Sequence, residues 1–518
     1  MGLRRSTLRI LRRELRTRRP SVALVSALAA LFLTSTAPGE DAAPPSPRQA
    51  WTPPGIDRYE SELGDIVHAD RNQIITIDPD KVYDLPELID LAERSNPRTR
   101  TAWERARQAA HAVGLTQSAY FPYLVASAAA GFERAFIPFP SLAAGPAPGQ
   151  ISIVGGSTLT TDAALEKGAL DLKWLLFDFG ERKATVQAAR EKLMMADVGF
   201  NAVHQRIVFD VTRHFYELDA ARQKVAVAES TLTNAQTVAE AALARFTNGL
   251  GTKPENLGAE EQEARAAFEL EGARGQLSDA RVALVESLGV APTIKLQVAA
   301  APDKLAPENI NESLEAMVDR ALSQRPDLVV ALAHVRASRA EVRKAKAAYY
   351  PKISLGANVG VAELNVSTHD SPYFGGGNYL FGAGLSAEWP IFDGFARRQK
   401  MHLAESELQA AESELAESRD VAVREVWQAY TDFKTALRQQ AAATKMLEAA
   451  QSAFDASLEA YRHGLATYVE VMDAQRNFAF ARSIGADTQS AIHTAASALA
   501  LSVGDLAKPP SQSTSHHR

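Results

Sequence analysis

The pentapeptide Trp174-Leu-Leu-Phe-Asp178 returns as Trp389-Pro-Ile-Phe-Asp393, 215 residues further along the chain. The same spacing continues downstream, where Asn248-Gly-Leu-Gly-Thr252 corresponds to His463-Gly-Leu-Ala-Thr467. Matches in one order at a fixed spacing indicate an internal duplication. The sequence therefore predicts two tandem structural repeats with the same order of elements.

Upstream of the pentapeptides the spacing is 229 residues, as between Ala119-Tyr-Phe-Pro122 and Ala348-Tyr-Tyr-Pro351. The first repeat thus holds fourteen more residues between Pro122 and Trp174, where we expect an exposed loop to take them up. We place the repeats at 84–289 and 313–504, joined by a linker at 290–312.

Each repeat contains two segments in which apolar residues alternate with small or polar ones, which is the pattern of a strand with one apolar face. The predicted strand pairs are 123–135 with 165–177, and 352–364 with 379–391. Their length fits a lipid-facing barrel, and Trp174 and Trp389 lie where an aromatic belt is expected. A soluble β-sandwich is the alternative. Three residues of the polar face are candidates to line a pore, although a solvated face explains them equally well: Asp171, Lys173 and Glu388.

Two proline-free stretches, 180–248 and 396–463, predict very long helices, each followed by a second helix at 253–288 and 468–503. At ~1.5 Å per residue the long helices reach on the order of 100 Å. Apolar residues recur every three or four positions, which predicts left-handed coiled-coil packing, with Arg222 as an outlier in the apolar seam.

Four residues are predicted to mark the change between helix and strand. Pro122 and Pro351 disfavour helix in the preceding residue. Asp178 and Asp393 follow the last strand of each repeat and are expected to cap the long helices. We expect all four to act as hinges between a barrel and a tunnel.

The N-terminus has eight arginines followed by the apolar run Ser21–Leu33, which predicts a signal peptide at 1–37 whose cleavage site stays open. Its removal changes the net charge from −6 to about −13, which argues against nucleic-acid binding. The chain has no cysteine, so lipidation and disulfides are excluded. We expect an extended arm at 38–83 and a disordered polar tail at 505–518.

Four amphipathic strands cannot close a barrel alone, and open edges are not tolerated in lipid. Three copies supply twelve strands and an interior wide enough for solute. The predicted fold is mainly α with membrane β: long antiparallel coiled coils form a hollow tunnel, and each chain gives four strands to a trimeric 12-stranded β-barrel.

The doubled Phe-Asp after a strand, the Tyr-Phe-Pro hinge and the tips Gly249-Leu250 and Gly464-Leu465 resemble the TolC-like outer membrane efflux proteins. The resemblance covers about 84–504. It implies a homotrimer in outer-membrane lipid, with a 12-stranded outer-membrane β-barrel and a periplasmic tunnel of coiled coils. It also implies that the homotrimer works with a periplasmic adaptor and an inner-membrane pump in efflux or type I secretion. The cargo (drug, metal or protein) and the pump class stay open.

The resemblance also implies roles for the hairpin tips. Gly249 and Gly464 favour a left-handed helix end, which by itself explains them. Docking of the adaptor at Leu250 and Leu465 is what the family adds.

A threonine precedes a glutamate by three residues at both tips, Thr252 with Glu255 and Thr467 with Glu470, which predicts two capping boxes. Capping alone accounts for the glutamates. The resemblance implies a further role, in which Glu470 and Asp473 form an acidic ring that sets cation preference at the periplasmic aperture.

Tyr461 matches the position of a gating tyrosine in the family, and Glu255 matches its acidic partner. The resemblance thus implies a latch that holds the mouth closed. Ala466 stands where some members carry a latch arginine, so we take Arg462 as its candidate replacement.

No phosphate-binding loop, His-Glu-x-x-His or Gly-x-Ser-x-Gly motif occurs in the sequence, and the 11 histidines are scattered. We therefore expect no enzyme activity, no cofactor and no metal. A coiled-coil structural protein of the envelope, or a periplasmic adaptor, is the alternative function. Neither explains two strand pairs beside two long helical hairpins.

Overall fold

The computed structural model describes residues 53, 56–72, 77–144, 151–301, 312–368 and 371–506. The chain divides into two compact units, residues 1–77 and 78–518. In the first unit, residues 56–72 form helix α3 (Ile56–Asn72), so the prediction of an extended arm was wrong for this segment. The predicted signal peptide at 1–37 lies outside the described residues. Of the predicted tail, residues 505 and 506 are described, and Asp505 pairs with Arg320 at 3.1 Å rather than lying free.

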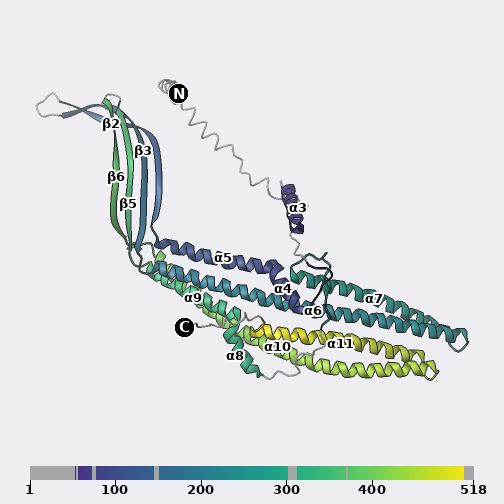
Figure 1. Ribbon diagram of the computed structural model, residues 1–518. Coiled ribbons are helices and arrows are strands. Elements are labelled where there is room, and N and C mark those ends of the chain that lie inside the picture. Colours follow the sequence, from purple (N-terminus) through teal and green to yellow (C-terminus); the bar gives the residue numbers. More distant parts are fainter. Residues whose placement is uncertain are drawn as a thin grey trace, which may run out of the picture. The chain divides into compact units, whose positions relative to one another are not determined.

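The second unit contains a four-stranded antiparallel sheet in the order β2-β3-β5-β6, whose strands lie side by side in Figure 1. Its strands are β2 (Tyr123–Ala144), β3 (Ile151–Phe177), β5 (Lys352–Thr368) and β6 (Ser371–Glu388). Ten of the fourteen extra residues of the first repeat lengthen β2 and β3 instead of forming a loop, and the other four fall within 145–150, outside the described residues. β6 ends three residues earlier than predicted, before Pro390, which has no N–H to donate to a ladder.

Both hairpins of the sheet have the same register. Tyr123 lies opposite Lys173 in the first hairpin, and Lys352 lies opposite Glu388 in the second. Adding the repeat spacings of 229 and 215 to the first pair gives the second pair. The duplication seen in the sequence is therefore kept in the backbone pairing.

One face of the sheet is largely apolar. The exposed apolar residues of this face include Leu124, Phe132, Phe136, Leu170, Trp174, Val359, Val361, Tyr379, Phe381 and Leu385. Charged residues interrupt the same face further from the helices, where Arg134 faces Asp162 and Glu166 faces Glu363. A largely apolar face is typical of strands that face lipid.

The first repeat places α4 (Leu85–Ser95), α5 (Pro97–Gln117) and the short 3₁₀ helix η1 (Ser118–Tyr120) before its strands, and α6 (Glu181–Thr247) and α7 (Lys253–Leu288) after them. The second repeat has α8 (Leu314–Gln324) and α9 (Pro326–Ala347), then α10 (Ala396–Arg462) and α11 (Tyr468–Val503). We expected one helix before each strand pair. The structure has two, because Asn96 and Arg325 precede prolines and adopt extended conformations, with ψ of 123° and 130°.

The helices form two long antiparallel hairpins, α6 with α7 and α10 with α11, and α11 also packs against α6 (Figure 1). The buried seam is narrow and rich in alanine. Val211, Phe215 and Leu218 are buried in it, whereas Leu243 and Phe246, which share the apolar spacing, are 49% and 39% exposed. Near the tip Val238 and Ala242 are the buried residues instead.

A parallel two-stranded ladder of β1 (Val82–Tyr83) and β4 (Gln297–Val298) lies beside the first hairpin. It joins the end of the predicted arm to the predicted linker. Arg222 of α6 donates to the carbonyl oxygen of Ala299, and Asp219 accepts from the N–H of Ala301. These contacts hold the linker against α6. No helix among the described residues is long and apolar enough to cross a membrane.

Candidate functional site

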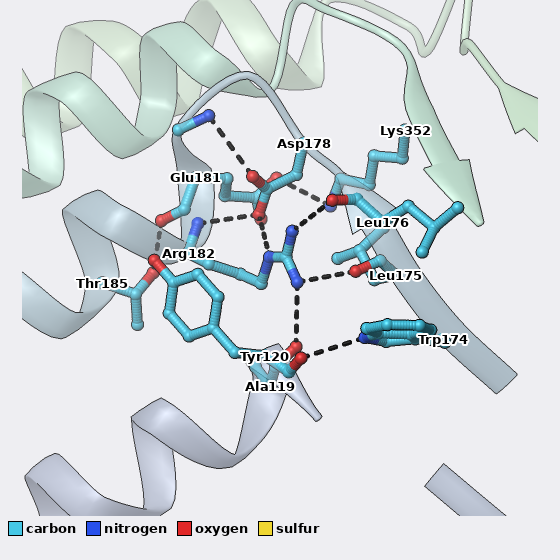
Figure 2. Close-up of polar contacts among 11 residues, drawn as sticks. Ala119, Tyr120, Trp174, Leu175, Leu176, Asp178, Glu181, Arg182, Thr185 and Lys352 are labelled. Atoms are coloured by element: carbon cyan, nitrogen blue, oxygen red, sulfur yellow. Dashed lines mark hydrogen bonds and ion pairs between the residues drawn. The ribbon is translucent and has the colours of Figure 1, made fainter. Parts of the chain in front are cut away.

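The junction between strand β3 and helix α6 is built on Asp178 and Arg182 (Figure 2). The Asp178 carboxylate accepts from the backbone N–H of Arg182 at 2.8 Å and from its Nε at 3.0 Å. Both side chains are nearly buried, with 7% and 11% of their surface exposed. The guanidinium also donates to three carbonyl oxygens that lie on either side of the junction, those of Ala119, Leu175 and Leu176.

Trp174 closes the same junction from the strand. Its Nε1 donates to the carbonyl oxygen of Tyr120 at 2.9 Å, and the Arg182 guanidinium lies 4.7 Å from the centre of the Tyr120 ring. The end of the preceding helix, the strand and the start of α6 are thereby fixed to one another. The tryptophan that we expected only in an aromatic belt also has this hydrogen-bonding task.

The second repeat contains the same junction. Asp393 accepts from the N–H and the Nε of Arg397 at 3.0 and 2.9 Å, and Trp389 donates to the carbonyl oxygen of Tyr349 at 3.0 Å. The Arg397 guanidinium lies 5.4 Å from the centre of the Tyr349 ring. Asp393 is more open than Asp178, with 26% of its side chain exposed.

The two aspartates act as caps from an unexpected position. The N-cap residues are Gly180 and Phe395, two residues further on, and neither supplies a side-chain cap. Each junction has two successive residues with positive φ, one phenylalanine and one glycine, in opposite order: Phe179 and Gly180, then Gly394 and Phe395. This turn brings the carboxylate back to the second N–H of the helix, which otherwise has no partner.

At the hairpin tips Gly249 and Gly464 have φ of 71° and 74°. The N–H of Leu250 bonds to the carbonyl oxygen of Arg245, and that of Leu465 to the carbonyl oxygen of Ala460, each at 2.8 Å. This is the Schellman end of a helix, which needs a left-handed residue. The Leu250 and Leu465 side chains are 73% and 84% exposed.

The next residues form two capping boxes. The Glu255 carboxylate accepts from the N–H of Thr252 at 3.1 Å, and that of Glu470 accepts from the N–H of Thr467 at 2.9 Å. The threonine hydroxyls accept from the glutamate N–H groups in return. One turn beyond Glu470, Asp473 is exposed and pairs with Arg476 at 3.3 Å.

Tyr461 is 2% exposed and lies in an apolar cluster that joins the two hairpins, because Val238 of α6 packs there with residues of α10 and α11. The Arg245 guanidinium, from the end of α6, lies 5.1 Å from the centre of the Tyr461 ring. The Tyr461 hydroxyl and the Arg245 Nε are buried and have no partner among the described residues. Burial raises the pKa of Tyr461, while the charge of Arg245 opposes this shift and that of Glu255 adds to it.

The structure does not bring Arg462 to this cluster. Its guanidinium pairs with Glu459 of the same helix at 2.7 Å and is half exposed. No sequence pattern pointed to Arg245, because the corresponding position of the second repeat is Ala460.

Two further contacts tie α11 to α6 across the hairpins. Gln475, which is 2% exposed, donates to the carbonyl oxygen of Thr231 at 3.0 Å, and Lys224 pairs with Asp487 at 2.7 Å. Among the described residues no group of three or more His, Cys, Asp or Glu side chains is placed to hold a metal ion.

The chain has two long helical hairpins and two strand hairpins, which are joined at two matched junctions. This arrangement is that of a class of membrane channel proteins. The chain matches the family model "Outer membrane efflux protein" over residues 88–290 and 317–505, and it belongs to that family. It is therefore a protein of the outer membrane, with long helices that extend away from the strands.

The relatives include protein CyaE of Bordetella pertussis, which is 29% identical over 432 residues, 83% of this chain and 86% of CyaE. The cation efflux system protein CusC of Escherichia coli K12 is 26% identical over 304 residues, 58% of this chain and 64% of CusC. Outer membrane protein OprJ of Pseudomonas aeruginosa is 27% identical over 328 residues, 62% of this chain and 64% of OprJ.

Solved structures share the fold. The outer-membrane channel OprN has a TM-score of 0.67 at 20% identity, covering 81% of this chain and 89% of OprN. Outer membrane protein VceC of Vibrio cholerae has a TM-score of 0.65 at 20% identity, covering 81% of this chain and 96% of VceC.

Proposed function

We propose that three copies of the chain form an exit duct in the outer membrane. The duct passively conducts substrates that a periplasmic adaptor and an inner-membrane pump deliver, in a tripartite efflux or type I secretion system. The proposal includes the absence of enzyme activity, in keeping with a family of channels. The observation that carries it is the sheet, whose outer strands β2 and β6 pair on one side only among the residues that the structure describes.

The pairing between the two repeats predicts how the strands of neighbouring copies pair. Within the chain β3 pairs with β5, and Lys173 lies opposite Gly356. Adding 215 to 173 gives Glu388 of β6, and subtracting 229 from 356 gives Ser127 of β2. We therefore expect Glu388 of one copy to lie opposite Ser127 of a second copy. Three such joints close twelve strands into a ring without a free edge, as lipid requires.

The two free edges also carry matching apolar residues. Inside the chain Phe179 stacks on Tyr350, with ring centres 5.0 Å apart. Phe179 corresponds to the Gly394-Phe395 pair of the second repeat, and Tyr350 corresponds to Phe121 of the first. In one copy Phe395 and Phe121 are 62% and 71% exposed. A second copy would cover both by repeating the internal contact.

The proposal extends to the tips. Glu470 and Asp473 line the periplasmic aperture and favour cations there, although in one copy each already has a partner in its own helix. Tyr461 serves as a gate latch near Glu255, with Arg245 in the place that we first gave to Arg462. The exposed Leu250 and Leu465 receive the adaptor.

Disulfide formation between copies tests the closure, because the chain has no cysteine of its own. In the proposed register Leu385 of β6 lies opposite Ala130 of β2 on the same face. The double variant Leu385→Cys/Ala130→Cys should give covalent trimers on oxidation, since directly opposed Cβ atoms lie about 5 Å apart. Leu385→Cys/Ala129→Cys is the matched control, because a shift of one residue moves the thiol to the other face. Equal cross-linking of both variants, or of neither, contradicts the proposed joint.

A further inference from the structure

A pocket of about 310 Å³ lies between α6, α7 and β4, far from the tips and from the sheet. Three arginines line it, Arg222, Arg274 and Arg281, with Ser278 beside them and no carboxylate in the lining. Its floor is apolar and includes Leu284 and Leu296, which are 0% and 6% exposed. The pocket therefore combines a positive rim with an apolar base.

Arg222 is the arginine that breaks the apolar seam of α6, and it is half-buried. Its guanidinium has five N–H donors, of which one bonds to the carbonyl oxygen of Ala299 at 3.2 Å. Burial lowers the pKa of Arg222, and the nearby charge of Arg281 lowers it further. Asp219 opposes this shift, but its carboxylate already accepts from the N–H of Ala301 and from Gln223.

The other two arginines leave the pocket positively charged. Arg281 has no hydrogen bond or ion pair to any residue within the ranges that the structure describes. Arg274 pairs with Glu271 at 2.8 Å and with Glu229 at 3.4 Å, and neither glutamate lines the pocket. Arg281 is exposed and Arg222 is half-buried, and their like charges lie close enough to affect each other. An anion bound between them would relieve this repulsion.

The second repeat shows that the fold does not need these arginines. The positions that correspond to Arg222 and Arg281 are Leu437 and Ala496, which pack against the buried cluster of α8, α10 and α11. The basic pocket is thus a property of the first repeat alone.

We propose that this pocket binds a small, soluble oxyanion with an apolar body, of which an aryl phosphate is the simplest model. Guanidinium groups bind phosphate oxygens in pairs, and the leucine floor offers a surface for the apolar part. A lipid phosphate is out of reach, because Arg222 lies 41 residues beyond the start of α6, about 60 Å along the helix. Nothing in the proposed duct function requires such a ligand.

Isothermal titration of the full-length, detergent-purified protein with phenyl phosphate tests the proposal. We expect one site per chain with a Kd below about 1 mM, which weakens as salt is added. Inorganic phosphate should bind at least about fivefold more weakly, since it leaves the apolar floor uncovered. Equal affinities for phenyl phosphate and inorganic phosphate would contradict the proposed contact between the apolar floor and the ligand. The absence of saturable binding of phenyl phosphate would overturn the proposal.

The variant Arg222→Leu/Arg281→Ala carries the residues of the second repeat, so it should fold, which thermal unfolding checks. It should bind phenyl phosphate at least about tenfold more weakly than the parent. Arg265→Ala is the control. Arg265 is exposed on α7, the helix of Arg281, where it pairs with Glu261 and does not line the pocket. Unchanged affinity in the double variant, or an equal loss in the control, would contradict a site made by these arginines.

Discussion

The Arg245 guanidinium lies over the ring of Tyr461, 5.1 Å from its centre, and so joins the end of α6 to the end of α10. The contact bridges the two hairpins of one chain close to their tips. Because the Tyr461 hydroxyl has no partner among the described residues, the ring is the part of the side chain that Arg245 contacts. A desolvated contact of this kind is worth up to about 2 kcal/mol.

The first prediction concerns this contact. Arg245→Gln and Tyr461→Leu should each loosen the mouth and raise the closed-state conductance several-fold in planar bilayers. Tyr461→Phe keeps the ring and should stay close to the parent. Arg462→Gln serves as the control, since among the described residues Arg462 pairs with Glu459 of its own helix and not with Tyr461 or Arg245. An open mouth in Arg462→Gln with a closed one in Arg245→Gln would contradict the assignment.

The second prediction concerns the aperture. Glu470→Gln/Asp473→Asn removes six charges from a trimer and should lower the cation preference measured as a reversal potential. Glutamine still serves in a capping box, so the helix start should remain. Glu261→Gln removes a charge from an exposed pair on α7 and should leave the reversal potential unchanged. An unaltered reversal potential in the double variant would exclude these two residues from the aperture.

The third prediction concerns the junctions. Arg182→Ala leaves the nearly buried Asp178 carboxylate without its partner and should cost about 3–5 kcal/mol of unfolding free energy. Arg397→Ala should cost less, because Asp393 is more open to water. Chemical unfolding followed by tryptophan fluorescence compares the two. Equal losses would show that burial does not set the difference.

The fourth prediction is a pH dependence. Burial alone would raise the pKa of Asp393, but the hydrogen bonds from the N–H and guanidinium of Arg397 outweigh it and hold the pKa below its usual 3.8. The charged form thus stabilises the folded protein above that pH, and the stabilisation is lost as the pH falls through the lower folded-state pKa. Asp393→Asn should show a smaller loss of stability on acidification. The same acid slope in parent and variant would contradict the assignment.

The sequence was sufficient for the features that the duplication repeats. The two long helices, the capping boxes at Thr252 and Thr467 and the glycine ends at Gly249 and Gly464 all follow from local chemistry, so a pattern in one chain reveals them. The family match supports the fold class and the outer-membrane location that the resemblance implied.

Other features depend on contacts between distant segments, which no local pattern reports. Arg245 meets Tyr461 only because α6 lies beside α10 and α11, and its repeat counterpart is an alanine. The extra residues of the first repeat were expected in a loop, yet ten of the fourteen lie in strands that pair with each other and lengthen β2 and β3. The breaks at Pro97 and Pro326 did have a local signal, since each proline restricts the residue before it.

The central claim is that the free edges of the sheet close in a ring of three copies. Electron cryomicroscopy of the detergent-purified protein tests it most directly. The account predicts a particle with three-fold symmetry, a barrel of twelve strands and a helical tunnel, in which Glu388 of each copy lies opposite Ser127 of the next. A monomer, a two-fold particle, or a three-fold particle in which β2 and β6 remain unpaired would contradict it.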